Sequence, residues 1–194
     1  MKYEYEKLTD EELFSLLSKS KEVSEKAFNE IYKRYSGKIY SYLYRLLGDK
    51  FFIKDIFQEV FTKVYKIGIE SKNRHLFSFR SYIYQATRNI CLNHYKNEGR
   101  LPEIHTEYVK LRTEDNANIS DTLDLVKAAV DKLPDNLREV FILSEFEELN
   151  YPAIAEITGD SQVNIRVKIH RARKMLKDIV LSLRNESKKM VENE

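Results

Sequence analysis

The sequence predicts an all-α protein made of two small helical domains joined by a flexible acidic linker. Glycine and proline are rare: the 194 residues include 5 and 3 of them, fewer than average usage would supply. Apolar residues recur at spacings of three and four through most of the chain, as they do on the buried face of a helix. This pattern stops after Asn97 and resumes near Leu123, so we expect two separate helical segments.

The first domain is predicted to span residues 10–98 and to begin with a capped helix. Thr9 precedes an acidic turn and a leucine-rich run, which is the position of an N-cap residue. Glu12 stands three residues later, where it can close a capping box. The next helices are expected at about residues 25–47, 51–67 and 76–95, with a turn at Gly48-Asp49 and a polar break over Gly68–Asn73.

The linker is predicted at residues 99–122 from its composition. Between Asn97 and Asp124 there are seven acidic residues and three basic ones, with little apolar periodicity. A polar stretch of this length is unusual inside one compact domain. We therefore expect it to connect two domains.

The second domain is predicted at residues 123–183 and contains a helix-turn-helix. Its helices are expected over about residues 123–133, from Pro134 to Leu143, over residues 151–158 and over residues 161–183, followed by a frayed tail. Within it, Ala155 supplies a small residue on the first helix of the motif, and Gly159 supplies the left-handed turn. Ile165 is placed to hold the second helix against the first. Asn150 and Ser161 are the expected N-caps of these two helices.

The charge on the second helix of this motif indicates DNA binding. Six basic residues and no acidic one lie between Ser161 and Lys177, whereas solvated helix faces usually mix charges. Helix-turn-helix proteins place the start of this helix in the major groove. The candidates for base edges and the groove are Asn164, Arg166, Val167, Lys168 and Arg171, and those for phosphates are Arg173 and Lys174. Ile165, Ile169 and Met175 are predicted to be core residues.

The sequence gives little support to other classes of protein, such as secreted, membrane or metal-binding proteins and enzymes. The single cysteine, Cys91, excludes a disulfide within the chain. No apolar run approaches the roughly 20 residues of a membrane helix, and the first six residues are too polar for a signal peptide. We expect a cytoplasmic protein without direct membrane insertion, without a metal and without a cofactor. The four scattered histidines and the lack of a nucleophile or phosphate-loop motif make an enzyme a poor alternative.

Six motifs occur in order along about residues 10–183. They are Phe28–Tyr35, Asp55–Phe61 and Phe79–Asn89 in the first domain, and Leu133–Phe141, Tyr151–Ala155 and Arg166–Arg173 in the second. Together they resemble the RNA polymerase sigma-70 family, in particular its extracytoplasmic-function (ECF) type. The resemblance implies a sigma-2 domain at residues 10–98 and a sigma-4 domain at residues 123–183. Such a protein binds core RNA polymerase and directs promoter-specific initiation by recognising −10 and −35 elements.

The resemblance also implies roles for individual residues. Asp55, Gln58 and Glu59, which share one helix face, match the surface that binds the β′ coiled coil of the polymerase, and the second domain would meet the β flap and read the −35 element of promoter DNA. The residues matched to the −10 element are Lys72, Asn73, Arg74, Arg80, Arg88, Asn89, Asn93 and Lys96. Phe77, Tyr82 and Tyr84 are candidates for stacking on unpaired bases, although Tyr82 also fits the core. The linker would thread toward the polymerase active site.

An anti-sigma factor is a further partner implied by the resemblance. The chain departs from the family at Val163, Val167 and Tyr82, which bears on the promoter bases rather than on the role. A conventional helix-turn-helix regulator that acts without polymerase remains the main alternative. Such regulators usually dimerise on two-fold sites, and the sequence has no heptad seam or obvious dimer helix.

Overall fold

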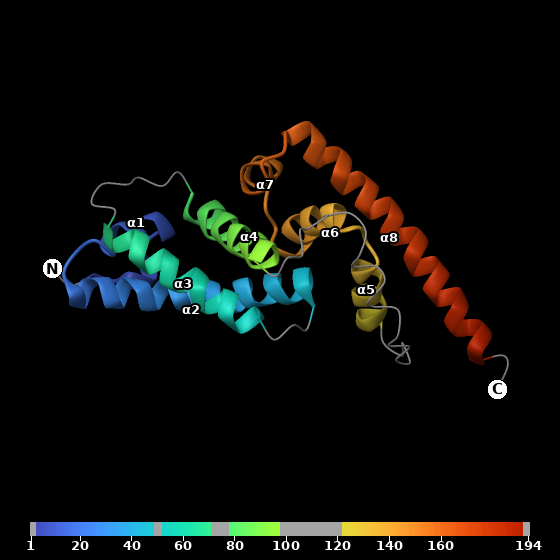
Figure 1. The fold of residues 1–194 in the computed structure, drawn as a ribbon, viewed down its shortest axis with the longest axis horizontal. Helices are drawn as coiled ribbons and strands as arrows, with labels where there is room; N and C mark the ends of the chain where they lie inside the picture. The colour runs from blue at the N-terminus through green and yellow to red at the C-terminus, as the bar shows by residue number, and fades with distance from the viewer. Residues whose placement is uncertain (1–2, 49–51, 71–77, 98–121, 192–194) are drawn as a thin grey trace. The chain divides into compact units, whose positions relative to one another are not determined.

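The computed structural model describes residues 3–48, 52–70, 78–97 and 122–191, and all regular structure in these ranges is helical (Figure 1). Backbone contacts divide the chain into two compact units, residues 1–99 with 156–159 and residues 100–155 with 160–194. The predicted all-α class is confirmed. The predicted linker lies outside the described residues except for Thr122, where a helix already begins.

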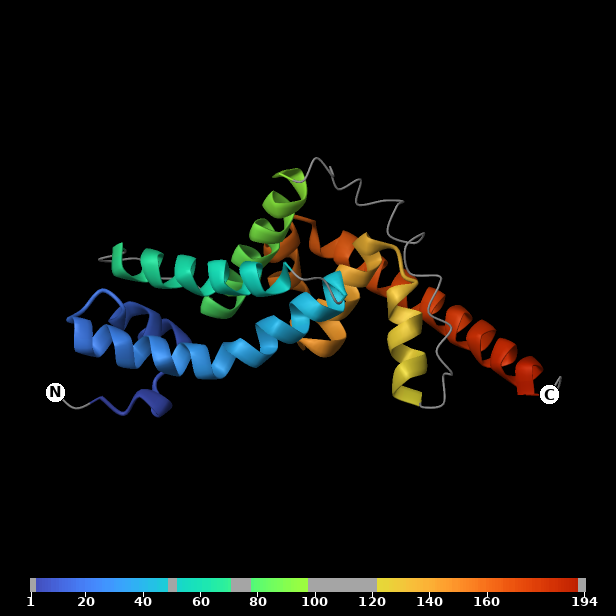
Figure 2. The same cartoon turned by 60° about the horizontal axis from the view of Figure 1, so that its bottom comes forward.

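The described residues from 3 to 97 form a 3-10 turn and four α-helices. They are η1 (Tyr5–Lys7), α1 (Asp10–Leu16), α2 (Lys21–Leu47), α3 (Ile53–Glu70) and α4 (Phe79–Asn97). Helices α2 and α3 run side by side, and α4 packs against α3 (Figure 2). The apolar faces of these helices meet in one core, in which Ile31, Ile39, Ile56, Val60 and Ile83 are fully buried.

Helix α1 begins as the sequence predicts. The Thr9 side chain accepts a hydrogen bond from the Glu12 backbone N–H at 3.2 Å, and the Glu12 carboxylate accepts one from the Thr9 N–H at 2.7 Å. This reciprocal capping box satisfies two backbone donors that the first helical turn leaves unpaired. The predicted N-cap is therefore confirmed.

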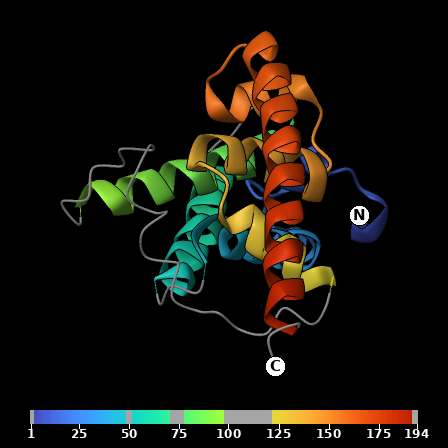
Figure 3. The ribbon, with the colours of Figure 1, turned by 90° about the vertical axis from the view of Figure 1, so that its right-hand side faces the viewer.

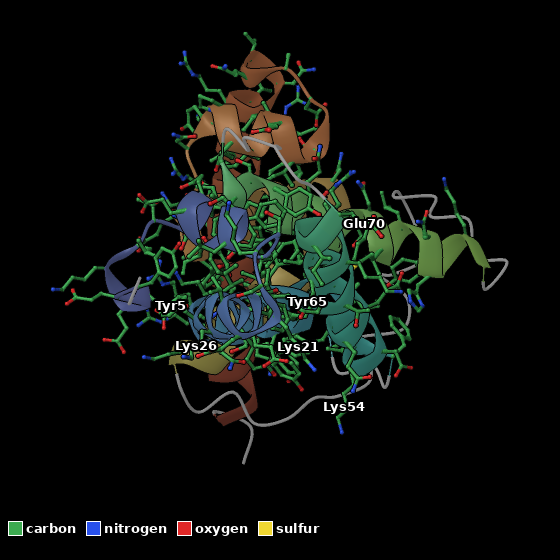
Figure 4. All side chains as sticks on the ribbon, turned by 90° about the vertical axis from the view of Figure 1, so that its left-hand side faces the viewer. Tyr5, Lys21, Lys26, Lys54, Tyr65 and Glu70 are labelled. Atoms are coloured by element: carbon green, nitrogen blue, oxygen red, sulfur yellow. The ribbon has the colours of Figure 1, made fainter. Side chains whose placement is uncertain are left out.

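Arg34 on α2 fastens the N-terminal segment to this helix. Its guanidinium donates hydrogen bonds to the backbone carbonyls of Tyr5, Glu6 and Leu8 and to the Asp10 carboxylate, over 2.8–3.2 Å. The same group donates to Glu30 at 2.9 Å. Tyr5 and Lys26 border a shallow hollow between η1 and α2 (Figure 4).

Helix α3 is longer than the sequence predicts. The expected polar break was to begin at Gly68, but the helix continues to Glu70 and Gly68 is buried within it. A Cβ atom built on Gly68 would lie 2.3 Å from Cδ1 and 2.7 Å from Cβ of Leu17. Glycine at this position therefore permits close approach of the segment after α1 to α3, rather than ending the helix.

Helix α4 begins against α1. The Phe79 backbone N–H donates to the Glu11 carboxylate at 2.8 Å, and the Phe79 ring packs against Phe14 and Tyr35. Tyr84, expected as a base-stacking residue, is instead fully buried with its ring against Tyr42. That prediction was wrong because Tyr84 follows the buried Ile83 and faces α2 rather than solvent.

The described residues 122–191 form four α-helices and a π-helical turn. They are α5 (Thr122–Asp131), α6 (Asp135–Phe141), η2 (Ile142–Phe146), α7 (Tyr151–Thr158) and α8 (Gln162–Val191). Helices α5 and α6 both pack along α8 (Figure 3). The predicted frayed tail is wrong as far as Val191, because α8 continues eight residues beyond Leu183.

A buried arginine joins α5 to α6. Arg138 has 2 % of its surface exposed and donates hydrogen bonds to the carbonyls of Val130, Asp131 and Leu133. It also pairs with Asp135 at 2.9 Å. The last carbonyls of a helix have no partner within it, so Arg138 satisfies those at the end of α5 and fixes the turn that follows.

Candidate functional site

The turn between α7 and α8 has the geometry that the sequence predicts. The Asn150 side chain accepts from the Ala153 backbone N–H at 3.0 Å, and the Ser161 hydroxyl accepts from the Asn164 N–H at 3.2 Å. Gly159 has a φ of 78°, a conformation that costs glycine little. Both expected N-caps and the left-handed turn are confirmed.

One face of α8 is open to solvent and the opposite face is buried. Ile165, Ile169 and Ala172 lie in the core at helical spacing. The exposed stripe, as we call it below, consists of Val163, Asn164, Val167, Arg171 and Lys174. Val163 is 72 % exposed and Val167 41 %, which is unusual for apolar side chains without a partner to contact. The prediction that Met175 is a core residue was wrong. Its side chain is 39 % exposed, because it lies outside the buried row formed by Ile165, Ile169 and Ala172.

The remaining basic candidates on α8 lie on the two flanks of this stripe and have partners within the chain. Lys168 donates to the Asp160 carboxylate at 2.5 Å. Arg173 donates to Glu145 at 2.6 Å, and this hydrogen bond raises the pKa of Arg173. The Arg166 guanidinium lies 6.0 Å from the centre of the Tyr151 ring, within reach of a cation–π interaction.

These acidic partners were not predicted. Asp160 stands eight residues before Lys168, within the turn that precedes α8, and Glu145 belongs to a different element from Arg173. The only signal in the sequence was the presence of acidic residues just outside the basic run. Which cation each acidic residue meets depends on how α8 packs against the preceding elements.

A second candidate surface lies on α3. Asp55, Gln58 and Glu59 are all exposed on the outward side of this helix, opposite the buried Ile56, Val60 and Val64. Glu59 lies 3.0 Å from the Nε2 atom of His94 on α4. The three side chains thus form one polar stripe with hydrogen-bond acceptors that a basic helix can meet.

Five of the residues proposed for the −10 element lie on α4. Arg80 and Arg88 are half-buried, and Asn89, Asn93 and Lys96 are exposed. Tyr82 is half-buried and its ring packs against Phe14, in keeping with the core role. Lys72, Asn73, Arg74 and Phe77 lie outside the described residues, so the structure describes five of the eight candidates.

An aromatic cluster beside the α3 stripe was not anticipated. Phe57 lies between two tyrosines of α2, with ring centres 6.1 Å from Tyr32 and 6.0 Å from Tyr40. Both tyrosines are more than 40 % exposed. The spacing of Tyr32 along α2 fits the buried face, yet its side chain lies at the surface.

The described residues offer neither a metal site nor a membrane-spanning helix. No group of three or more histidine, cysteine, aspartate or glutamate side chains is arranged to hold a metal ion. No helix there is both long and apolar enough to cross a membrane.

Comparison with known proteins assigns both parts of the chain to one family. Residues 31–101 match the family model described as sigma-70 region 2, and residues 123–176 match sigma-70, region 4. Two solved structures share the fold: the sigma factor RpoE in complex with the anti-sigma factor NepR from Bartonella quintana, and CnrH in complex with the cytosolic domain of CnrY. Their TM-scores are 0.63 and 0.65 at 19% and 17% identity; the matches cover 80% and 90% of this chain, and 97% and 99% of those chains.

Curated relatives agree over most of their length. The chain is 30% identical to the ECF RNA polymerase sigma-E factor of Haemophilus influenzae, over 92% of this chain and 98% of the relative. It is 28% identical to the sigma-E factor of Escherichia coli over 92% and 97%, and 26% identical to SigM of Bacillus subtilis over 77% and 92%. The chain therefore belongs to the ECF group of sigma-70 RNA polymerase sigma factors.

Proposed function

We propose that this protein binds core RNA polymerase and directs transcription initiation at promoters that carry matching −10 and −35 elements. The observation that carries this proposal is the succession of sigma-70 region 2 and region 4 in one chain. A regulator that acts without polymerase needs a DNA-binding module but has no need of region 2. The protein is an initiation factor and has no catalytic activity of its own in this proposal.

The −35 element is read by the second unit. Val163, Asn164, Val167 and Arg171 supply the base contacts, because they are exposed near the start of α8, the part of a recognition helix that enters the major groove. Lys174 lies further along the same face, where it meets phosphate. Arg166 and Arg173 lie at the sides of this face and belong to the same site, whereas Lys168, which the sequence also predicts there, is paired with Asp160.

The first unit carries the polymerase contact and the −10 contact. Asp55, Gln58 and Glu59 bind the β′ coiled coil through their acceptor groups. Arg80, Arg88, Asn89, Asn93 and Lys96 on α4, together with Lys72, Asn73 and Arg74, bind the −10 element. We assign the sigma-2 domain to residues 10–98 and the sigma-4 domain, which also meets the β flap, to residues 123–183.

A regulatory partner belongs to the proposal. Both structural neighbours were solved as complexes, one of them with an anti-sigma factor. We propose that an anti-sigma factor controls this protein as well. Because its targets are core polymerase and promoter DNA, we place it in the cytoplasm.

The test is promoter-dependent transcription with purified components. The full chain is added to sigma-free core polymerase on a pool of templates with randomised upstream sequence, and transcripts are sequenced. We expect a subset of templates to be enriched, with two shared sequence elements separated by a fixed distance. If the chain alone protects a DNA site from cleavage and no transcripts appear, the regulator alternative is correct instead.

A further inference from the structure

The basic residues of α8 differ in whether the protein itself neutralises them. Six cations lie between Ser161 and Lys177. Lys168 and Arg173 are paired with carboxylates. Arg166, Arg171, Lys174 and Lys177 form no ion pair with any of the residues that the structure describes. Total charge is therefore a poor guide to which of these side chains meets DNA.

The Lys168–Asp160 pair is the more enclosed of the two. The side chains are 26 % and 27 % exposed, and Nζ lies 2.5 Å from Oδ2. Lys168 precedes the fully buried Ala172 by one helical turn, so its stem runs along the edge of the core. A short hydrogen bond between charged groups, partly withdrawn from water, is stronger than one on an open surface.

The position of Asp160 in the turn favours its ion pair with Lys168. It directly precedes Ser161, the N-cap of α8, where the positive end of the helix dipole favours a carboxylate. The positive φ of the preceding Gly159 sets the direction of the chain at this point. The carboxylate is thus held by the turn itself, beside the side of α8 that carries Lys168.

If the ion pair with Asp160 were removed, the Lys168 side chain would be able to reach DNA. It precedes Arg171 by three residues, and residues at this spacing are neighbours on a helix surface. Arg171 belongs to the exposed stripe. A lysine at the edge of that stripe is suited to a phosphate contact, which adds affinity for any sequence and no discrimination between bases.

We propose that Asp160 is a positioning residue that withholds Lys168 from DNA and thereby lowers the sequence-independent affinity of the second unit for DNA. This inference rests on the proposed function and names a determinant within it. Binding to phosphates supplies most non-specific affinity. By neutralising one cation, Asp160 lowers affinity for arbitrary sequence while leaving the exposed stripe to read the −35 bases.

The test measures DNA affinity of holoenzyme assembled from core polymerase and the full chain. The probes are a fluorescent duplex of arbitrary sequence and a duplex enriched from a randomised pool by the wild-type holoenzyme. Each is titrated between about 50 and 200 mM KCl to obtain the salt slope. The variants are Asp160→Asn, Lys168→Gln, their combination, Asp160→Glu, and Asp178→Asn, the same change at an exposed carboxylate of α8.

We expect Asp160→Asn to raise affinity for the arbitrary duplex about three- to tenfold at low salt and to steepen the salt slope by about one. Lys168→Gln should lie within about twofold of wild type, and the double variant should return to it. Asp160→Glu and Asp178→Asn should behave as wild type. The salt slope is informative because a merely structural role for Asp160 would not add a phosphate contact.

Three outcomes would overturn the inference. Asp160→Asn could leave the affinities for the arbitrary and the enriched duplex unchanged. It could raise them to the same extent whether or not Lys168 is also replaced. It could weaken binding to the enriched duplex, which would mean that Asp160 aims Lys168 at DNA. In all three the wild-type holoenzyme still selects a duplex, so the proposed function stands. If wild-type chain yields no sequence-selective holoenzyme at all, both proposals fail.

Discussion

Gly68 shows how a single residue determines the spacing of two segments. A side chain there would meet Leu17 at 2.3 Å and 2.7 Å, and one of these contacts is with the Leu17 Cβ, which cannot rotate away. We predict that Gly68→Ala lowers the free energy of unfolding by about 1–2 kcal/mol, since overpacking costs about 1–3 kcal/mol and the gain in helix propensity offsets part of it.

The matched control for this prediction is Gly37→Ala in α2. No atom lies within 4 Å of a Cβ built on Gly37. This change should therefore raise the free energy of unfolding by about 0.5–1 kcal/mol, the usual difference between glycine and alanine inside a helix. Urea unfolding of the two variants measures both effects, and a stabilised Gly68→Ala would show that α3 can move away from Leu17.

Tyr35 should make the stability of the first unit depend on alkaline pH. Burial raises the pKa of the Tyr35 hydroxyl, and its 2.5 Å hydrogen bond to the Asp10 carboxylate raises it further. The folded state therefore keeps a proton that the unfolded chain releases above about pH 10. The stabilisation is complete below that pH and is lost as the pH rises through the raised folded-state value.

We predict that Tyr35→Phe is less stable than wild type by about 1 kcal/mol at neutral pH, because the hydrogen bond is lost. Above about pH 10, its stability should fall less steeply than that of wild type. Urea unfolding between about pH 8 and 11 measures this difference, with Tyr40→Phe on the exposed surface as control. Parallel curves for wild type and Tyr35→Phe would contradict the prediction.

At the scale of elements, the sequence predicts the starts of α1, α7 and α8 better than the ends of α3 and α8, whereas α2 begins four residues earlier than expected. Side chains close in sequence cap the starts of α1, α7 and α8, so local pattern is sufficient. The ends of α3 and α8 depend on other information. Glycine usually weakens a helix, but Gly68 is retained in α3 by its contact with Leu17, a residue about fifty positions away. Apolar periodicity ends near Leu183, yet α8 continues to Val191.

The start of α4 illustrates an element positioned by a distant one. The Glu11 carboxylate of α1 accepts the Phe79 N–H at 2.8 Å, and so takes the part of an N-cap from outside the helix. We predict that Glu11→Ala lowers the free energy of unfolding by about 1 kcal/mol, the usual effect of losing a cap. Glu11→Gln keeps a carbonyl acceptor and should retain most of the stability.

The same pair of variants tests whether this contact matters for promoter opening. If Glu11 positions α4, holoenzyme with Glu11→Ala should bind a duplex that carries only a −35 element as wild type does. It should bind poorly to a template with an unpaired −10 strand, and Glu11→Gln should restore that binding. Equal loss on both templates would mean that Glu11→Ala acts on the fold as a whole.

At the scale of the whole molecule, the sequence predicts where the surfaces lie but not how their charges are used. Helical spacing alone places Asp55, Gln58 and Glu59 on one exposed face and Val167 and Arg171 on another. The pairs Lys168–Asp160 and Arg173–Glu145 join residues 8 and 28 positions apart, and no periodicity predicts them. Tyr84 was misplaced for a related reason, since an aromatic ring suits both a core and a base stack.

The two surfaces belong to different units of the chain, so changes in one should leave the function of the other intact. We predict that Asp55→Lys abolishes binding to core polymerase, because it presents a cation to the basic coiled coil, while the unfolding transition stays within about 0.5 kcal/mol of wild type. Glu70→Lys makes the same change of charge near the end of α3, away from the stripe, and should bind polymerase normally. Affinity is measured by fluorescence titration with labelled core enzyme.

Arg171→Ala should give the opposite result. Loss of a base contact weakens binding to the −35 element by about 1–3 kcal/mol, and affinity for core polymerase should not change. Wild type and both variants are compared by polymerase titration and by binding of holoenzyme to the enriched duplex. If Asp55→Lys retains polymerase binding, the contact lies elsewhere on the first unit, with the exposed Tyr32 and Tyr40 as the next residues to replace. If Arg171→Ala binds the duplex as wild type does, the reading face of α8 must be reassigned to its flanks, where Arg166 and Arg173 lie.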